Sequence, residues 1–207
     1  MKARKTTLAA LLVFALAGTA VAQSRPDALQ LYRQGRYEDA VEVTLAELEE
    51  TPRNMNSYTV LGWSLLALGR YQDALDYGER ALAISRYDSR IVQIVGESHY
   101  RLGNNVEALD YLQEYVAIAP TGDLIDQVYF FMGEVFMRLG EYNHADVAFS
   151  TAVYHNDGDA RWWSRLGYAR ELAGDLPFAE SAYQTALDLN SGLTEAQRGL
   201  DRIENQL

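Results

Sequence analysis

The feature that most constrains this chain is a short sequence unit that returns five times at a nearly fixed interval. The unit is seen in the segments QGRYEDAVEV, LGRYQDALDY, LGNNVEALDY, LGEYNHADVAF and AGDLPFAESAY. Their glycines are Gly35, Gly69, Gly103, Gly140 and Gly174, at spacings of 34, 34, 37 and 34 residues. Five positions after each glycine stands an alanine: Ala40, Ala74, Ala108, Ala145 and Ala179. A period of this length indicates one supersecondary unit repeated along the chain.

Each unit has the pattern of two helices joined by a tight turn. In the second unit, Asn56 to Leu68 lacks proline and is mostly apolar at helical spacing. Gly69 follows, and a left-handed glycine commonly ends a helix. From about Gln72 to Ser85, the apolar residues again fall on one face. Helices of about 12 residues are marginal alone in water, so neighbouring units must stack to bury their apolar faces.

A second small residue precedes each turn glycine by seven positions. These residues are Ala28, Gly62, Gly96, Gly133 and Gly167. Glycine inside a helix costs about 1 kcal/mol relative to alanine. Its return at the same point in four units predicts a close approach between the paired helices, with the small alanine of the second helix opposite.

The pattern resembles the tetratricopeptide repeat. Matching positions in the second and fourth units are Leu61, Gly62, Tyr71, Ala74, Tyr142, Ala145, Phe149 and Ala152. The resemblance covers about Pro26 to Leu193 and implies an all-α fold, a right-handed superhelical array of helix-turn-helix repeats known as an α-solenoid. Some positions depart from the family: Thr44, Gly78 and Leu112 stand where an aromatic residue is typical.

The sequence predicts a signal peptide over residues 1–22. Lys2, Arg4 and Lys5 precede an apolar run, and small residues end in Ala20-Val21-Ala22. The alternative is a retained membrane anchor, but the apolar run is shorter than the roughly 20 residues that span a bilayer. We therefore expect an exported protein, periplasmic or otherwise extracytoplasmic, with no stable membrane insertion after cleavage.

The rest of the chain is predicted to form one repeat domain and a cap. The tetratricopeptide-repeat domain would occupy residues 23–193, as five repeats over 23–54, 55–88, 89–125, 126–159 and 160–193. Residues 194–207 read as one more helix, with Ala196, Leu200 and Ile203 on one face. Repeat arrays need a terminal helix with a polar outer face, so this helix is predicted to be the cap.

Composition argues against several classes of function. The net charge of −11 disfavours partners such as nucleic acid and anionic lipid, and signal removal would make the chain still more acidic. No cysteine is present, which excludes disulfides and thiolate chemistry. The sequence contains no nucleophile motif or phosphate loop, and His99, His144 and His155 form no metal-ligand pattern. We expect no catalytic residue, no metal and no cofactor.

The resemblance implies that the first helices of successive repeats line a concave groove. The candidate residues for binding a protein or peptide there are Trp63, Leu66, Tyr100, Arg101, Phe130, Glu134, Met137, Arg138, Arg161 and Tyr168. Tyrosine, tryptophan and arginine dominate protein-binding hot spots. The alternative is that tight coiling buries some of them as core. Trp163 occupies a structural position of the family and is expected in the core, with Trp162 partly exposed.

One specialised use of such a groove can be tested residue by residue. Relatives that grip a C-terminal carboxylate use lysine and asparagine, whereas this chain has no lysine after Lys5 and has Glu97 and Glu134 at the asparagine positions. Arg161 and Arg165 resemble only the last pair of that clamp, so an acidic chain terminus is not the expected ligand.

The leading hypothesis is therefore an interaction scaffold of the cell envelope that binds a partner peptide or protein, of unknown identity, in the groove. The alternative is a ligand-binding accessory module, for a lipid, glycan or solute, of an envelope transport system. Self-association through the ends of the array also stays open.

Overall fold

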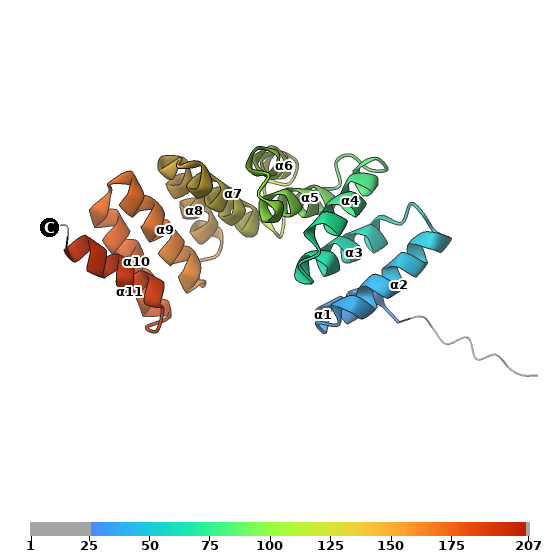
Figure 1. Ribbon diagram of the computed structural model, residues 1–207, viewed down its shortest axis with the longest axis horizontal. Coiled ribbons are helices and arrows are strands. Elements are labelled where there is room, and N and C mark those ends of the chain that lie inside the picture. Colours follow the sequence, from blue (N-terminus) through green and yellow to red (C-terminus); the bar gives the residue numbers. More distant parts are fainter. Residues whose placement is uncertain (1–25, 206–207) are drawn as a thin grey trace, which may run out of the picture.

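The computed structural model describes residues 26–205, so the predicted signal peptide lies outside the described part. Within this part the chain contains helices and turns but no strand, which confirms the all-α prediction (Figure 1). The helices are α1 (Ala28–Arg33), α2 (Tyr37–Glu50), α3 (Met55–Ala67), α4 (Tyr71–Leu82), α5 (Ser89–Leu102), α6 (Asn105–Ile118), α7 (Ile125–Leu139), α8 (Tyr142–His155), α9 (Ala160–Ala173), α10 (Leu176–Leu189) and α11 (Thr194–Glu204). The first is short because Pro26 lies so close to the turn at Gly35.

The helices form a curved solenoid rather than a ball with one centre. Each helix packs against the next in the chain, and α3 also contacts α5, α5 contacts α7, and α9 contacts α11. Figure 1 shows the resulting arch, with α1 and α2 at one end and α11 at the other. The buried apolar side chains of the described residues fall into four clusters along this array. Stacking of neighbours thus supplies the core, as expected for helices of 6 to 15 residues.

The turn glycines adopt the predicted left-handed conformation. All five have φ between 72° and 84°, and within the described chain no other residue type has positive φ. In the third unit, the N–H of Gly103 donates to the carbonyl of Tyr100, and the N–H of Asn104 to that of His99, at 2.9 Å. These bonds satisfy carbonyl groups at the helix end and turn the chain sharply into α6.

The glycines inside the first helices do mark close approaches, but the predicted alanine partner is wrong. A Cβ atom at Gly133 would lie 2.6 Å from the ring of Phe149, and one at Gly167 would lie 2.8 Å from the ring of Tyr183. The glycines therefore make room for large side chains nine positions after the turn glycine. The alanine five positions after the turn is fully buried in every unit, but it is not the residue that faces the glycine.

Gly78 stands at that large-residue position in the second unit, and the next repeat fills the space it leaves. A Cβ atom at Gly62 would lie 2.7 Å from Cδ1 of Ile94, and one at Gly78 would lie 2.6 Å from Cγ2 of Val95. Ile94 and Val95 belong to α5 and are fully buried. The departure from the family pattern therefore lets α5 pack directly into the α3–α4 pair.

Helix α11 closes the array over the fully buried Tyr183. The ring lies between Gly167 of α9 and Gly199 of α11, where an added Cβ atom would collide with it. The tyrosine hydroxyl donates to Glu171 at 2.6 Å, and Arg202 binds both oxygens of the same carboxylate at 2.6 and 2.7 Å. Burial alone would raise the pKa of Glu171, but these hydrogen bonds outweigh it and lower the pKa. Packing around the Tyr183 ring and the charged hydrogen bonds to Glu171 therefore both hold α11 against α9 and α10.

Gly167→Ala should destabilise the protein by about 1–2 kcal/mol, because the collision with Tyr183 outweighs the gain in helix propensity. Urea unfolding followed by circular dichroism measures this change. The control is Gly158→Ala, because Gly158 has no left-handed φ and an added Cβ would meet only Oδ1 of Asn156 at 3.8 Å. That variant should stay within about 0.5 kcal/mol of wild type. Equal unfolding midpoints for the two variants would contradict the proposed packing.

Candidate protein-binding groove

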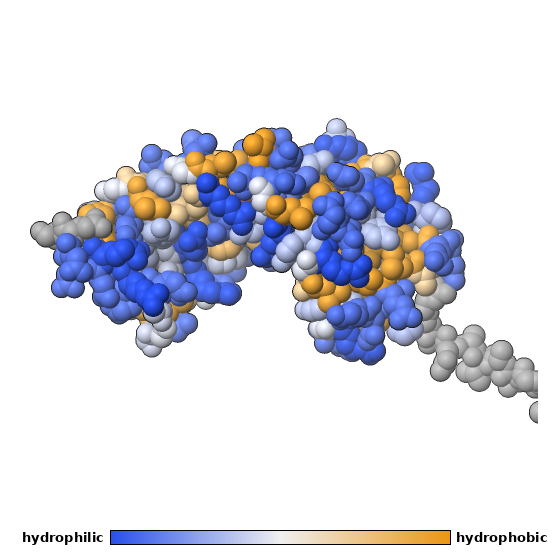
Figure 2. Space-filling view, in the orientation of Figure 1, coloured by the Kyte–Doolittle hydropathy of each residue, from blue (hydrophilic) through white to orange (hydrophobic). Residues whose placement is uncertain are grey.

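The C-terminal half of the solenoid carries a groove of about 780 Å³ between α5, α7, α9 and α11, here called the C-terminal groove. Figure 2 shows the molecule as an arch that is hollowed on one side between its two ends. The groove is lined by Tyr100, Arg101, Phe130, Glu134, Arg161, Trp162, Ser164, Arg165, Tyr168, Tyr183, Leu193, Glu195, Arg198 and Arg202. Its size is within the range of about 300–1,000 Å³ that is usual for ligand sites.

The floor of the C-terminal groove is aromatic. The ring of Phe130 stacks on Trp162, with centroids 4.9 Å apart and planes 15° apart. Phe130 also contacts the ring of Phe149, which is fully buried, at a centroid distance of 5.5 Å. A floor anchored in the core is rigid, and it offers a flat apolar surface to a side chain from outside.

The structure reverses the expected roles of the two adjacent tryptophans. Trp162 is only 9% exposed and fills the space beside Phe130, whereas Trp163 is half-buried. The indole N–H of Trp163 donates to the carbonyl of Asp157 at 2.8 Å, so this ring covers the turn before α9. The prediction placed Trp163 in the core from its repeat position, but the neighbouring Trp162 is the ring that is buried against Phe130.

Arginine side chains dominate the walls, and the carboxylates that bind them lie deeper. Arg101, Arg161, Arg165 and Arg202 pair with Glu97, Asp159, Glu134 and Glu171 respectively. These arginine side chains are 34–78% exposed, while their carboxylate partners are only 7–26% exposed. A ligand in the groove therefore meets N–H donors first, although the chain as a whole is acidic.

Glu97 is the most constrained of these carboxylates. It accepts hydrogen bonds from Gln93 at 2.8 Å and from Arg101 at 3.1 Å. Burial raises the pKa of Glu97, and the attraction of Arg101 and the bond from Gln93 offset this only in part. Gln93 is 2% exposed, and its Oε1 has no hydrogen-bond partner.

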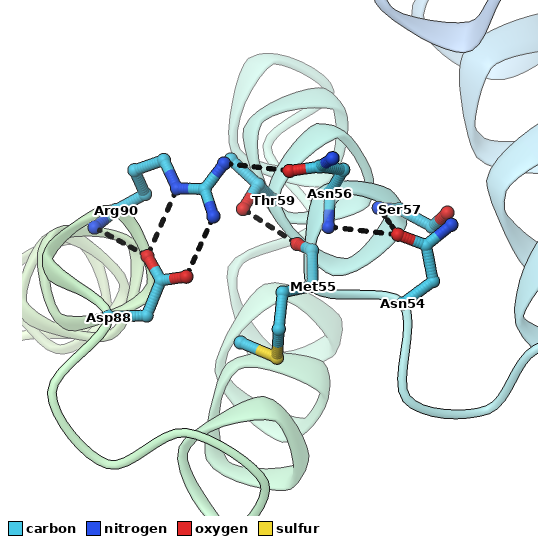
Figure 3. Close-up of polar contacts among 7 residues, drawn as sticks. All are labelled: Asn54, Met55, Asn56, Ser57, Thr59, Asp88 and Arg90. Carbon is cyan, nitrogen blue, oxygen red and sulfur yellow. Dashed lines mark hydrogen bonds and ion pairs between the residues drawn. The ribbon is translucent and has the colours of Figure 1, made fainter.

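A second, N-terminal hollow of about 530 Å³ lies where α3 and α5 begin, and Trp63 and Arg90 are among its lining residues. Its polar groups largely bind one another, as Figure 3 shows. Arg90 binds both oxygens of Asp88 at 3.0 and 2.7 Å and reaches Asn56 of the preceding repeat at 3.0 Å. Asn54 accepts the N–H groups of the first turn of α3. Since Arg90 ties two repeats together, we assign this polar cluster to the cohesion of the array.

The predicted groove residues do not form one continuous path. Six of them line the C-terminal groove: Tyr100, Arg101, Phe130, Glu134, Arg161 and Tyr168. Trp63 lines the N-terminal hollow and lies 5.8 Å from the ring of Tyr32. Leu66 and Met137 pack against core clusters. Arg138 donates to the carbonyl of Tyr100 at 2.7 Å and lies over its ring. For all ten predicted residues, a role in binding a partner stays a prediction.

Sequence reasoning missed the part of the groove that α11 contributes. Leu193, Arg198 and Arg202 line the groove, yet the terminal helix was predicted only as a cap. Arg198 and Arg202 are four positions apart and therefore share one face of a helix, which was the available signal. Trp162 was missed because its neighbour matched the family position.

Within residues 26–205, no group of three or more histidine, aspartate or glutamate side chains is arranged to hold a metal ion. No helix in the same range is both long and apolar enough to cross a membrane.

The family profile of the tetratricopeptide repeat matches residues 26–89 and 132–193. The crystal structure of MamA is similar, with 20% identity, a TM-score of 0.68, and coverage of 80% of this chain and 95% of that chain. A thermophilic TPR protein of Thermus thermophilus, TTC0263, shares 22% identity over 84% of this chain and 94% of its own, with a TM-score of 0.63. At such identities the likeness concerns the fold. No curated protein sequence matches this chain.

Glu97→Gln should change how stability depends on pH. Because folding raises the pKa of Glu97 above its ordinary value of 4.5, the folded state binds more protons between those two values. The contribution of Glu97 to the free energy of unfolding therefore falls as the pH rises through this interval. In urea titrations, the variant should gain stability relative to wild type as the pH rises from 4.5 through the raised pKa. The control is Glu180→Gln, at an exposed position of α10. A constant difference between Glu97→Gln and wild type would contradict the burial of this charge.

Proposed function

The chain belongs to the tetratricopeptide-repeat family, and from this premise we propose that it is an interaction scaffold of the cell envelope that binds a partner segment in the C-terminal groove. Proteins of this family are typically non-catalytic scaffolds, and the proposed activity is binding without chemistry. The observation that carries the proposal is the stacked pair of Phe130 and Trp162, which forms the floor of an open groove rimmed by arginine.

Aromatic floors of this kind are suited to anchoring a protein segment. A partner that covers Phe130 removes apolar surface from water, at roughly 25 cal/mol for each Å² buried. Tyr168 lies beside the guanidinium groups of Arg165 and Arg202, 5.6 and 5.5 Å from its ring centre. Those contacts order the rim before binding, so less conformational entropy is lost when the partner docks.

The envelope location is supported by the sequence of residues 1–22 alone. A positive start, an apolar run and a small-residue end indicate export. Intact-mass measurement of the protein from its native host should give a chain that begins at Gln23, in the envelope fraction. A chain that begins at Met1 in the cytoplasmic fraction would remove the envelope from the proposal but leave the scaffold.

A second candidate is a ligand-binding module for a lipid, glycan or solute. The volume of the C-terminal groove, about 780 Å³, favours it, because a small molecule of ordinary size would fit. Native mass spectrometry separates the two candidates, since a retained small molecule adds a discrete mass to the purified protein.

A photoreactive amino acid in place of Tyr168 should crosslink the partner in native envelopes. The matched control is the same group in place of Tyr154, which is 84% exposed on α8 and does not line the groove. We expect a discrete product at position 168 that is absent at position 154. Phe130→Ala in the same chain should lower the affinity for the partner by about 30-fold, as removal of a hot-spot aromatic does. The yield of the crosslinked product should fall accordingly. Equal products at both positions, or none at 168, would count against the groove.

A further inference from the structure

We propose that the C-terminal groove ends in a carboxylate subsite between α9 and α11. The bound segment would place an aspartate or glutamate there, next to an aromatic or large aliphatic side chain on the Phe130–Trp162 floor. This inference rests on the proposed function, because it names the chemistry of the segment that the same groove binds.

The terminal helix is part of the groove, not only a cover for the core. Arg198 and Arg202 of α11 line the groove together with Arg161 and Arg165 of α9. The family profile ends at residue 193, so the arginines of α11 have no counterpart in the matched repeats. The subsite is thus formed in part by a helix that lies outside the matched repeats.

Arg198 is the arginine of the groove that lacks a carboxylate. It is exposed, and among the described residues it makes no hydrogen bond or ion pair. Arg165 and Arg202 use Nε and Nη2 to hold Glu134 and Glu171, which leaves their Nη1 groups without a partner in the described structure. Arginine carries five N–H donors, so each can bind a second acceptor while keeping its first.

The carboxylates already present do not take up these donors. Glu134 and Glu171 are 15% and 7% exposed and lie beneath their arginines. Glu195 differs from these two carboxylates because its side chain is exposed at the groove, three positions before Arg198. The described structure gives it no ion pair. Glu195 should therefore repel an acidic ligand that Arg198 attracts, which gives two neighbouring positions with opposite expected effects.

Charge selects the kind of segment that can dock. The chain carries 29 acidic and 18 basic side chains, so most of its surface repels an acidic partner. At the C-terminal groove, the more exposed guanidinium groups of Arg165 and Arg202 lie above the largely buried carboxylates of Glu134 and Glu171, and Glu195 is the exposed acidic side chain of the lining. Charge-assisted hydrogen bonds to arginine are strong and directional, and arginine also stacks on aromatic rings. A segment with an acidic residue beside an aromatic one would bind the arginines of the rim through its carboxylate and cover Phe130 and Trp162 with its ring.

The test uses fluorescence anisotropy of the purified protein with three labelled peptides, GSDFDAGS, GSNFNAGS and GSDADAGS. The first should bind, and replacing its two aspartates by asparagine should weaken binding by about tenfold. Replacing its phenylalanine by alanine should weaken it by a similar factor, because the floor is then uncovered.

Protein variants then locate the subsite. Arg198→Gln should weaken GSDFDAGS by about fivefold, and Glu195→Gln should strengthen it by about twofold. Arg53→Gln is the control, because it makes the same change in net charge at an exposed position outside the groove. It should leave the affinity within about twofold of wild type.

Each other outcome overturns the subsite. Equal affinity of GSDFDAGS and GSNFNAGS, with loss for GSDADAGS, would leave an apolar groove without acid recognition, so the proposed function would survive. Equal effects of Arg198→Gln and Arg53→Gln would show that the peptide is attracted by the overall charge of the protein and not by the subsite. No binding of any peptide at about 1 mM would remove the subsite, while crosslinking at Tyr168 independently decides whether the groove binds a partner.

Discussion

No helix within residues 26–205 is long enough to be stable by itself, and the architecture of this part follows from that constraint. Each helix must be covered by the next, so burial runs along the array in successive clusters instead of meeting at one centre. The left-handed glycines set the geometry of this coverage, because they return the chain within a few residues. The fully buried alanines, such as Ala74 and Ala145, keep the packed helices close.

Where one repeat has a small residue at a packing position, large side chains of the next repeat fill the space. Phe149 and Tyr183 fill the space beside the glycine of their own first helix, whereas Gly78 cannot. Ile94 and Val95 from the following repeat enter instead. The array is therefore not five equal units in a row. The second and third repeats share a core, and a change at Gly78 acts first on α5.

The sequence predicts the fold well and the groove only in part, for a physical reason. Period, turn glycines and apolar faces are local properties, so they follow from spacing along the chain. Which of two adjacent tryptophans is buried depends on how far α7 and α9 diverge, and spacing alone does not determine this. The contribution of Arg198 depends likewise on the angle at which α11 crosses α9. Phe130 and Tyr168 were predictable because the side of a first helix that faces the groove recurs with the repeat, here in α7 and α9.

The hydrogen bonds of Arg202 and Tyr183 to Glu171 also bear on how such an array can grow in evolution. Repeat proteins commonly lengthen by duplication of a unit. A copy of any repeat other than α9–α10, placed after α10, would move α11 away from Glu171, and it would separate the arginines of α11 from those of α9. A duplicate placed before α9 leaves that junction intact. Lengthening that keeps the groove's arginine-rich end therefore requires an α9–α10 repeat next to α11, so these three helices are inherited as one block.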